Sequence, residues 1–242
     1  MMRTLVIGDI HGGFKALLQL LKRAKVTTED RLIFLGDYVD GWSESATLID
    51  FLIQLDKKQT CVFIKGNHDV WWGEWLEYQK TDNKIWYQNG GRETITSYRG
   101  ASYDLAAHYT FYKKLKNYHI DDQNRLFIHA GFSSMHGPQK EVYESNYSWD
   151  RTLWEMALTM DTNIEKTASV YPQRLKLFSE IYIGHTPTIK YNRDTPMRGV
   201  NVWNIDTGAA FTGKLTALDI ETKEYWQSDA LPSLYPMESG RN

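Results

Sequence analysis

The chain has 242 residues, 42% hydrophobic and 24% charged, with a formal net charge of −2. This composition is typical of a folded α/β protein of one or two domains and excludes a disordered or fibrous chain. The near-zero charge provides no basic stripe for nucleic acid, and the absence of a run of about 18 apolar residues predicts no membrane partner.

The first seventy residues predict βαβ units on a mostly parallel sheet, because apolar runs of strand length alternate with helical periodicity. The expected strands are TLVIGD (4–9), RLIFLGD (31–37) and CVFIKGNHD (61–69). The expected helices are residues 14–24 and 46–58.

The rest of the chain repeats strand-length runs between two polar-aromatic insertions, at about 70–120 and 133–178. We expect one domain over residues 1–242, with a poorly ordered tail after about residue 230. The further expected strands are RLFIHAG (125–131) and EIYIGHT (180–186), followed by a hairpin of NVWNIDTGAA (201–210) and KLTALDIE (214–221).

The single cysteine allows no intrachain disulfide, which favours a reducing compartment. The N-terminal stretch MMRTLVIGD becomes polar too soon to form the apolar region of a secretory signal peptide. Together these features predict a cytoplasmic protein.

Polar residues follow five of the expected strands directly. Because loops at the carboxyl ends of strands in an open α/β sheet converge on one crevice, these side chains are expected to meet. Any one of them alone is explained as well by a turn or a structural histidine, but five such strand ends favour a site. The residues are Asp9, His11, Asp37, Asp40, Asn67, His68, Asp69, His129 and His185.

These residues offer oxygen and imidazole donors and no thiolate. Such donors favour hard or borderline ions, namely Mn²⁺, Fe or Zn²⁺, over a cysteine-rich structural zinc site. The donors are too many for one ion, whereas two divalent ions about 3.5–4 Å apart would use six protein ligands. The sequence therefore predicts a dinuclear metal site.

In this order and spacing, the strand-end motifs resemble those of the calcineurin-like metallophosphoesterases. The resemblance is strongest to the phosphoprotein-phosphatase branch, with its bacterial and bacteriophage lambda type enzymes and the related diadenosine tetraphosphatases, and it covers about residues 4–220. It implies a four-layer α-β-β-α sandwich. The motifs are GDIHG (8–12), GDYVDG (36–41), GNHD (66–69), HAG (129–131) and GHTP (184–187), and the similar stretches are NGGRETITSY (89–98) and NIDTGAAFTGKLTALDIET (204–222).

The resemblance also implies the ligands of each metal. Asp9, His11 and His185 would hold one ion, Asn67 and His129 the other, and Asp37 would bridge the two. Mn²⁺ is the expected ion, with Fe or Zn²⁺ as alternatives. The implied reaction is hydrolysis of a phosphomonoester by a hydroxide that bridges the metals.

His68 is the expected general acid for the leaving oxygen, with Asp40 fixing the tautomer and orientation of its ring. The alternative is that His68 only supports the neighbouring metal ligand through a hydrogen bond. Asp69 is expected to cap the helix that follows and is assigned no further role.

The second motif departs from the family pattern, in which an arginine that binds the substrate phosphate follows the aspartate. Here Gly41 follows Asp40, so one phosphate ligand is missing. Arg151, twenty-two residues after His129, is expected to bind phosphate, the alternative being a surface ion pair with a nearby acid. Arg92 is a second candidate for the missing ligand.

Four tryptophans follow the GNHD motif, near the rim of the expected site. Packing is the default interpretation of aromatic residues at helical spacing, and stacking on a nucleobase or forming a lid are the alternatives. The residues are Trp71, Trp72, Trp75 and Trp86.

Three functions remain open on the sequence. The first is a metal-dependent serine/threonine protein phosphatase, with dual specificity as a variant, acting on phosphorylated proteins or small phosphoesters. The second is a nucleotide phosphohydrolase, as in the symmetrical cleavage of dinucleoside tetraphosphates. The third is an interaction module that kept the metals and lost the chemistry, which the complete set of expected ligands disfavours.

Overall fold

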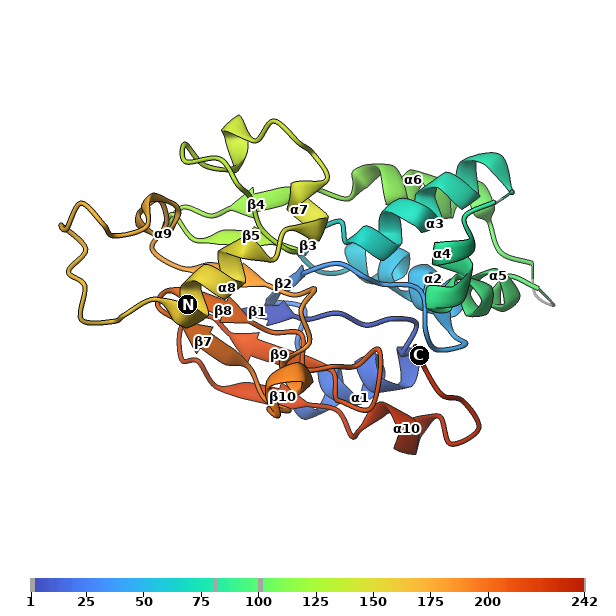
Figure 1. Cartoon of the computed structure of the whole chain (residues 1–242). Helices are drawn as coiled ribbons and strands as arrows, with labels where there is room; N and C mark the ends of the chain where they lie inside the picture. The colour runs from blue at the N-terminus through green and yellow to red at the C-terminus, as the bar shows by residue number, and fades with distance from the viewer. Residues whose placement is uncertain (1–2, 81, 100–101, 242) are drawn as a thin grey trace.

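The computed structural model describes residues 3–80, 82–99 and 102–241, which form two five-stranded mixed sheets (Figure 1). The first sheet consists of β1 (Thr4–Ile7), β2 (Arg31–Phe34), β3 (Cys61–Phe63), β9 (Thr216–Asp219) and β10 (Tyr225–Gln227), in the order β10-β9-β1-β2-β3. The second consists of β4 (Tyr118–Ile120), β5 (Leu126–Ile128), β6 (Ile181–Ile183), β7 (Met197–Gly199) and β8 (Val202–Asn204), in the order β4-β5-β6-β8-β7.

Alternation along the strands places the sheets face to face. In β1, Val6 packs with Phe127 and Tyr182 of the second sheet, whereas Leu5 and Ile7 belong to the cluster on the opposite face. The rings of Phe127 and Tyr182 stack at 5.1 Å within this inner layer. Because side chains of a strand alternate between faces, each of these strands contributes to two cores.

Helices cover the outer face of each sheet. On the first sheet they bury apolar residues such as Leu17, Leu48 and Trp72, and on the second Leu153 and Leu175. The predicted α/β sandwich with helices outside two sheets is therefore confirmed. The longer helices are α1 (Phe14–Arg23), α2 (Ser45–Asp56), α3 (Asn67–Tyr78), α6 (Leu105–Lys114) and α8 (Thr152–Thr159). The short ones are α4 (Lys84–Trp86), α5 (Arg92–Ser97), α7 (Asn146–Trp149), α9 (Gln173–Lys176) and α10 (Leu231–Leu234), with single turns at Tyr87–Gly91, Pro138–Lys140 and Thr188–Tyr191.

The predicted hairpin near the C-terminus is wrong. β8 pairs with β6 and β7 in the second sheet, and β9 pairs with β1 and β10 in the first. The connection after β8 crosses between the sheets and is closed by a 2.6 Å hydrogen bond between the hydroxyls of Thr207 and Thr216. Local apolar patterns identify two strands but not the sheet that each one joins.

The prediction of a poorly ordered tail is also wrong. Leu231 and Tyr235 are buried, with at most 1% of each exposed. The Tyr235 ring stacks on the indole of Trp42 at 5.1 Å between centroids. Aromatic stacking of this kind buries enough apolar surface to hold the C-terminal segment against the rest of the protein, although the sequence of the segment is rich in polar residues.

The topology gathers the carboxyl ends of several strands at one edge. β1, β2 and β3 run parallel, as do β5, β6 and β8. The polar residues that follow them lie in the loops at this edge, which is where a ligand site is expected. Within the described ranges no helix has the length and hydropathy needed to cross a membrane.

Candidate metal and phosphate site

The six residues expected to bind metal come together in one buried cluster at the carboxyl ends of the strands. None has more than 8% of its surface exposed. Buried charges are costly unless they are paired or bound to a cation, so a concentration of this kind needs a compensating charge. The six are Asp9, His11, Asp37, Asn67, His129 and His185.

The backbone at the site is strained. Four polar residues adopt the left-handed region that disfavours side chains with a Cβ atom. Such strain persists only where the surrounding structure enforces it, and it aims these side chains into a common space. The residues, with their φ angles, are His11 (53°), Asp37 (51°), Asp40 (73°) and His185 (67°).

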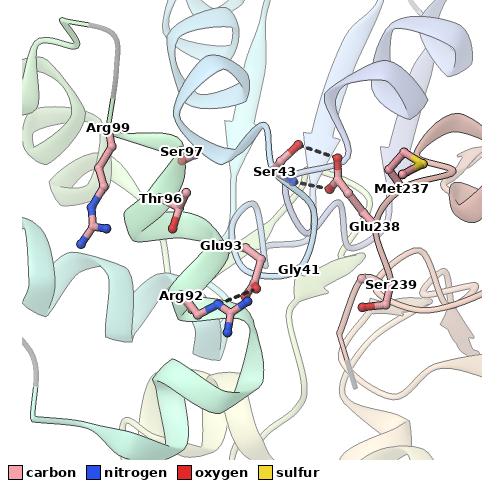
Figure 2. A pocket seen from close by; sticks show the side chains of 11 residues that line it. Gly41, Ser43, Arg92, Glu93, Thr96, Ser97, Arg99, Met237, Glu238 and Ser239 are labelled. Carbon is pink, nitrogen blue, oxygen red and sulfur yellow. Dashed lines mark hydrogen bonds and ion pairs between the residues drawn. The ribbon is translucent and has the colours of Figure 1, made fainter.

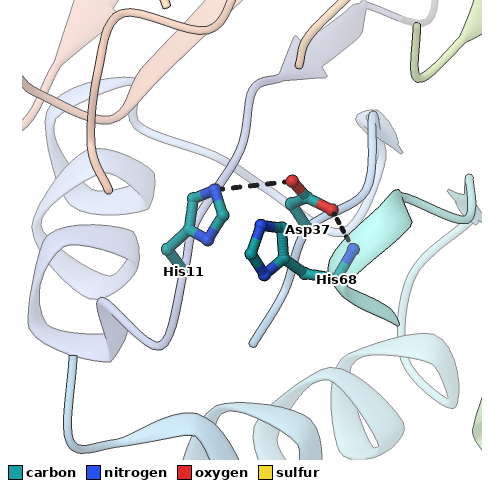
Figure 3. Close-up of side chains that lie close together, drawn as sticks. All are labelled: His11, Asp37 and His68. Carbon is teal, nitrogen blue, oxygen red and sulfur yellow. Dashed lines mark hydrogen bonds and ion pairs between the residues drawn. The ribbon is translucent and has the colours of Figure 1, made fainter. Parts of the chain in front are cut away.

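Asp37 lies at the centre of the cluster (Figure 3). Its Oδ2 atom is 3.5 Å from Nε2 of His11 and 3.5 Å from Nε2 of His129. Its Oδ1 atom accepts a 3.0 Å hydrogen bond from the backbone N–H of His68. Gly66 allows this arrangement, because a Cβ atom there would lie 2.1 Å from Oδ1 of Asp37.

Two histidines are fixed in the tautomer that suits a metal. Nδ1 of His11 donates to the backbone carbonyl of Asp40 at 2.8 Å, and Nδ1 of His129 donates to that of Leu35 at 2.7 Å. A carbonyl oxygen only accepts, so Nδ1 carries a proton and Nε2 is the ring nitrogen left to bind a metal. A backbone partner of this kind is what metal-ligating histidines commonly have.

His185 groups with different residues from those that the resemblance implies. Its Nδ1 atom is 2.9 Å from Oδ1 of Asn67, and its ring centroid is 5.1 Å from that of His129. Donor atoms of Asp37, His129 and His185 lie within 4.8 Å of one another, and a second group of this size joins His11 and Asp37 to His68. The geometry therefore moves the His185 side chain to the Asn67 and His129 side of the cluster.

The donor set fits divalent cations. Oδ1 of Asp9 and Nε2 of His185 are buried and have no hydrogen-bond partner among the described residues. Burial alone would lower the pKa of His129, but the negative charges of Asp37 and Asp9 raise it to about 10. The protein thus favours positive charge at this place, and oxygen and neutral imidazole donors are suitable ligands for Mn²⁺, Fe or Zn²⁺.

His68 is held beside this cluster by a buried carboxylate. Its Nδ1 atom is 2.7 Å from Oδ2 of Asp40, which leaves Nε2 as the ring nitrogen free of Asp40. Asp40 also accepts from Nε1 of Trp86 at 2.6 Å and from the hydroxyl of Thr94 at 2.6 Å. The backbone N–H of Asp40 donates in turn to the Thr94 hydroxyl at 2.9 Å. The His68 ring is thereby fixed through a connected network.

Burial dominates the protonation of this pair. It lowers the pKa of His68 to about 3, against the opposing charge of Asp37. It raises the pKa of Asp40, while the hydrogen bonds from Thr94 and Trp86 favour the carboxylate. A negative charge bound near His68 would raise the pKa of the imidazole, because an opposite charge favours its protonated form.

The Thr94 hydroxyl can be removed with little change of shape. We expect Thr94→Val to lower the kcat of the metal-loaded protein roughly 10- to 100-fold with KM nearly unchanged, since hydrogen bonds to charged groups are worth about 1.5–3 kcal/mol. Steady-state kinetics measure the split between the two constants. Thr94→Ser restores the hydroxyl and serves as the matched control. Equal kcat values for the valine and serine variants would contradict a role in positioning Asp40.

Asp69 does more than cap a helix. Its carboxylate accepts from the backbone N–H of Gly66 at 2.8 Å, which caps the start of α3 as predicted. The same carboxylate accepts from the backbone N–H groups of Asp37 at 2.8 Å and Tyr38 at 2.9 Å. It therefore joins two of the loops that carry the metal-ligand candidates.

A cavity of about 220 Å³ opens above the cluster. Arg151 lines it, and no ion pair between Arg151 and Glu155 is present among the described residues. Arg92 does not reach it, because it lines a neighbouring cavity and pairs with Glu93 (Figure 2). The residues lining the 220 Å³ cavity are Asp37, Asn67, His68, Trp71, Ile85, Asn89, Trp149, Arg151, His185 and Arg241.

The four tryptophans divide into three roles. Trp72 and Trp75 pack in the insertion, where Trp72 is fully buried and the Trp75 ring lies 4.9 Å from that of Tyr98. Trp86 binds Asp40, as described above. Trp71 lines the cavity, with its ring 5.1 Å from that of His68.

The sequence did not point to several residues of the site. Asp206, just after β8, is buried. Burial is the main cause of the raised pKa of Asp9, and the negative charge of Asp206 is the second cause. Thr94 lies within the NGGRETITSY stretch, whose similarity to the family was the one available signal. Trp149 and Arg241 carried no local signal, because each reaches the cavity through tertiary packing alone.

The chain is similar to curated proteins over most of its length. Two curated relatives, from Oceanobacillus iheyensis and Anoxybacillus flavithermus, are named bis(5'-nucleosyl)-tetraphosphatase PrpE [asymmetrical]. The first is 24% identical, covering 93% of this chain and 91% of the relative, and the second is 28% identical, covering 96% and 94%.

Solved structures share the fold. A putative diadenosine tetraphosphatase superposes with a TM-score of 0.66 at 17% identity, covering 95% of this chain and 94% of that one. A serine/threonine phosphatase from Saccharomyces cerevisiae, similar to human phosphatase PP5, gives 0.62 at 15% identity, covering 95% and 80%.

The family model for the calcineurin-like phosphoesterases matches residues 2–207, most of the chain. That region includes all six metal-ligand candidates together with His68 and Asp40. The protein belongs to the calcineurin-like phosphoesterase family and is a metal-dependent hydrolase of phosphoric esters.

Proposed function

We propose that the protein hydrolyses a dinucleoside polyphosphate, with two divalent metal ions as cofactors. The chain is similar along most of its length to relatives named as asymmetrical tetraphosphatases. On that basis the proposed products of a dinucleoside tetraphosphate are a nucleoside triphosphate and a nucleoside monophosphate, rather than the two diphosphates of symmetrical cleavage. The sequence-based expectation of a serine/threonine protein phosphatase stays a prediction.

The observation that carries the proposal is an aromatic rim on the cavity. Trp71 and Trp149 both line it, and their rings meet edge to face at 5.3 Å. Trp149 is 40% exposed, so part of its ring is open to solvent. Aromatic faces beside a phosphate site suit a substrate that carries a nucleobase, because stacking on an aromatic ring is worth about 1–3 kcal/mol per base. A phosphoserine or phosphothreonine side chain has no aromatic group.

Two divalent ions in this cluster would neutralise the anionic substrate and lower the pKa of a bound water into the neutral range. His68 supplies the proton that the leaving oxygen needs when the P–O bond breaks, from Nε2, since Nδ1 is engaged by Asp40. Bound phosphate raises the pKa of His68 from the low value set by burial. Asp40 keeps the ring orientated throughout.

Arg151 is proposed to bind the substrate phosphate. Arg151 lines the cavity with the ligand candidates, and a guanidinium can form paired hydrogen bonds to phosphate oxygens. Arg151→Ala is expected to raise KM about 10-fold or more with metal content unchanged. Kinetics on an aryl phosphate, with metal analysis, measure both. Wild-type kinetics in this variant would exclude the role.

The substrate proposal is tested by comparing three classes of substrate. The Mn²⁺-loaded protein is given diadenosine tetraphosphate, a phosphoserine peptide and 4-nitrophenyl phosphate, and kcat/KM is compared. We expect the dinucleotide to give the highest value, with ATP and AMP as products by chromatography. Turnover of the peptide without the dinucleotide would establish the protein phosphatase. Inactivity of folded, metal-replete protein on all three would favour the interaction module.

A further inference from the structure

An arginine from the far end of the described chain reaches the candidate active site. Arg241 lines the cavity together with His68 and Arg151, although about ninety residues separate it from Arg151 in the sequence. It ends the segment 235–241, which follows α10. The question is what holds this side chain there and which ligand it suits.

Trp42 and Ser43, just after the second motif, hold the segment 235–241. The ring of Tyr235 stacks on that of Trp42, with 5.1 Å between centroids and 24° between planes. The carboxylate of Glu238 accepts from the backbone N–H of Ser43 at 2.9 Å and from its hydroxyl at 2.7 Å (Figure 2). The segment therefore has an aromatic and a charged attachment to the same short loop.

The last residues of the segment are fixed by the loop between β8 and β9. Nε1 of Trp42 donates to the carbonyl of Ala209 at 2.7 Å, and the backbone N–H of Arg241 donates to that of Ala210 at 2.8 Å. Gly240 passes directly against the Trp42 ring, since a Cβ atom there would lie 2.7 Å from Cζ2. These contacts set the direction in which the Arg241 side chain leaves the backbone.

The Arg241 side chain passes over the residue that follows Asp40. A Cβ atom on Gly41 would lie 3.4 Å from Cγ of Arg241 and 3.2 Å from the carbonyl oxygen of His11. Gly41 also has a φ of +135°, a conformation that side chains rarely allow. The aliphatic part of Arg241 thus lies in van der Waals contact with the place where a side chain on residue 41 would begin, beside the position where the sequence lacks a phosphate ligand.

The guanidinium of Arg241 has few partners in the protein. Nη2 donates to the side-chain oxygen of Asn89 at 3.3 Å, and Cζ is 5.3 Å from the ring centroid of Phe211. Nε is buried and has no hydrogen-bond partner among the described residues, whose ion pairs do not include Arg241.

Arg241 is partly exposed, but its buried Nε has no hydrogen-bond partner and no carboxylate pairs with its charge among the described residues, so a ligand that supplies the counter-charge is favoured. The ligand that the cavity is built for is anionic, and a guanidinium can hold two oxygens of a phosphate group with parallel hydrogen bonds. We propose that Arg241 binds a phosphate group of the substrate, in the place left by the glycine after Asp40. This inference rests on the proposed phosphohydrolase function and adds a substrate-binding residue to it.

Inorganic phosphate is the probe, because its binding does not require turnover. Calorimetric titration of the metal-loaded full chain should show the Kd for phosphate rising about 10- to 100-fold in Arg241→Ala, the range for a lost charge-assisted hydrogen bond. Arg241→Lys keeps the charge without the fork and should recover part of the affinity. Arg193→Ala, which removes an exposed arginine elsewhere, is the matched control.

Glu238→Gln tests the attachment of the segment separately. It keeps Arg241 and weakens the contact with Ser43, so we expect a several-fold rise in the phosphate Kd. In the Arg241→Ala background, Glu238→Gln should not raise the phosphate Kd further, because Glu238 affects phosphate binding only through the position of Arg241. Metal content and the thermal melting of each variant show that the site and the fold are intact.

The outcomes separate this inference from the proposed function. If the wild type hydrolyses phosphate esters and Arg241→Ala has unchanged phosphate affinity and KM, the inference is overturned. A tighter phosphate Kd or a higher kcat in Arg241→Ala would also overturn it, because the segment would then cover the site. If the wild type hydrolyses no ester and Arg241→Ala binds phosphate more weakly than the wild type does, the proposed function fails and the phosphate-binding role stands.

Discussion

His68→Ala is expected to lower kcat by about 10²–10⁴-fold, the range for a lost general acid, while the protein keeps its metal content. The loss should be largest for esters with poor leaving groups, since their oxygen must be protonated as it departs. 4-Nitrophenyl phosphate, whose leaving group needs little protonation, should be affected least. Kinetics on phenyl and 4-nitrophenyl phosphate measure the loss of kcat and its dependence on the leaving group. Metal analysis of the same samples measures the metal content.

A second variant guards against a trivial loss of structure. His68 is 1% exposed, and alanine would leave Asp40 buried without its histidine partner. His68→Asn supplies an amide donor near the place of Nδ1 and keeps more of the packing. It should show the same leaving-group dependence as alanine. Equal losses for both esters would exclude His68 as the general acid, and loss of one metal per chain would mean that His68 acts as a metal ligand.

The residues of the metal cluster were predictable because of where they stand in the sequence. Asp9 and Asp37 each follow an apolar run of strand length, and parallel strands place such ends at one edge. The motif order then fixed the family. The sequence pattern does not show which side chains are neighbours in the folded protein. His185 was expected beside His11, but its side chain lies against Asn67 and His129.

The residues that surround the cluster were not predictable in the same way. Thr94, Trp86 and Arg241 reach Asp40 or the cavity from helices and a tail whose local patterns indicate packing or disorder. Their placement depends on tertiary contacts, such as the stacking of Tyr235 on Trp42, that no periodicity encodes. The glycine after Asp40 appeared in the sequence as a missing arginine, and the structure places another arginine, Arg241, beside it.

Asp37→Asn should have the largest effect on metal binding. Oδ2 of Asp37 lies 3.5 Å from Nε2 of both His11 and His129, so its charge is shared by both sides of the cluster. Losing an outer hydrogen-bond partner of a ligand costs about 10–100-fold in metal affinity, so removing a charge shared by two sites should cost more at each. Elemental analysis should find fewer than two metals per chain, with activity reduced in proportion. Asp122→Asn, at an exposed aspartate, is the matched control.

The stability of the same variant tests whether Asp37 acts through the metals or through the fold. Without metal, burial disfavours the Asp37 carboxylate, but the positive charge of His129 lowers the pKa of Asp37 well below its usual range, so the carboxylate stabilises the fold at neutral pH and asparagine should lower the Tm of the metal-free protein. Saturating Mn²⁺ should raise the wild-type Tm, because a ligand at 100 times its Kd stabilises the folded state by about 2.7 kcal/mol, and this increase should shrink in Asp37→Asn. Two metals per chain and a full Mn²⁺-dependent rise in Tm would remove Asp37 from the bridging position.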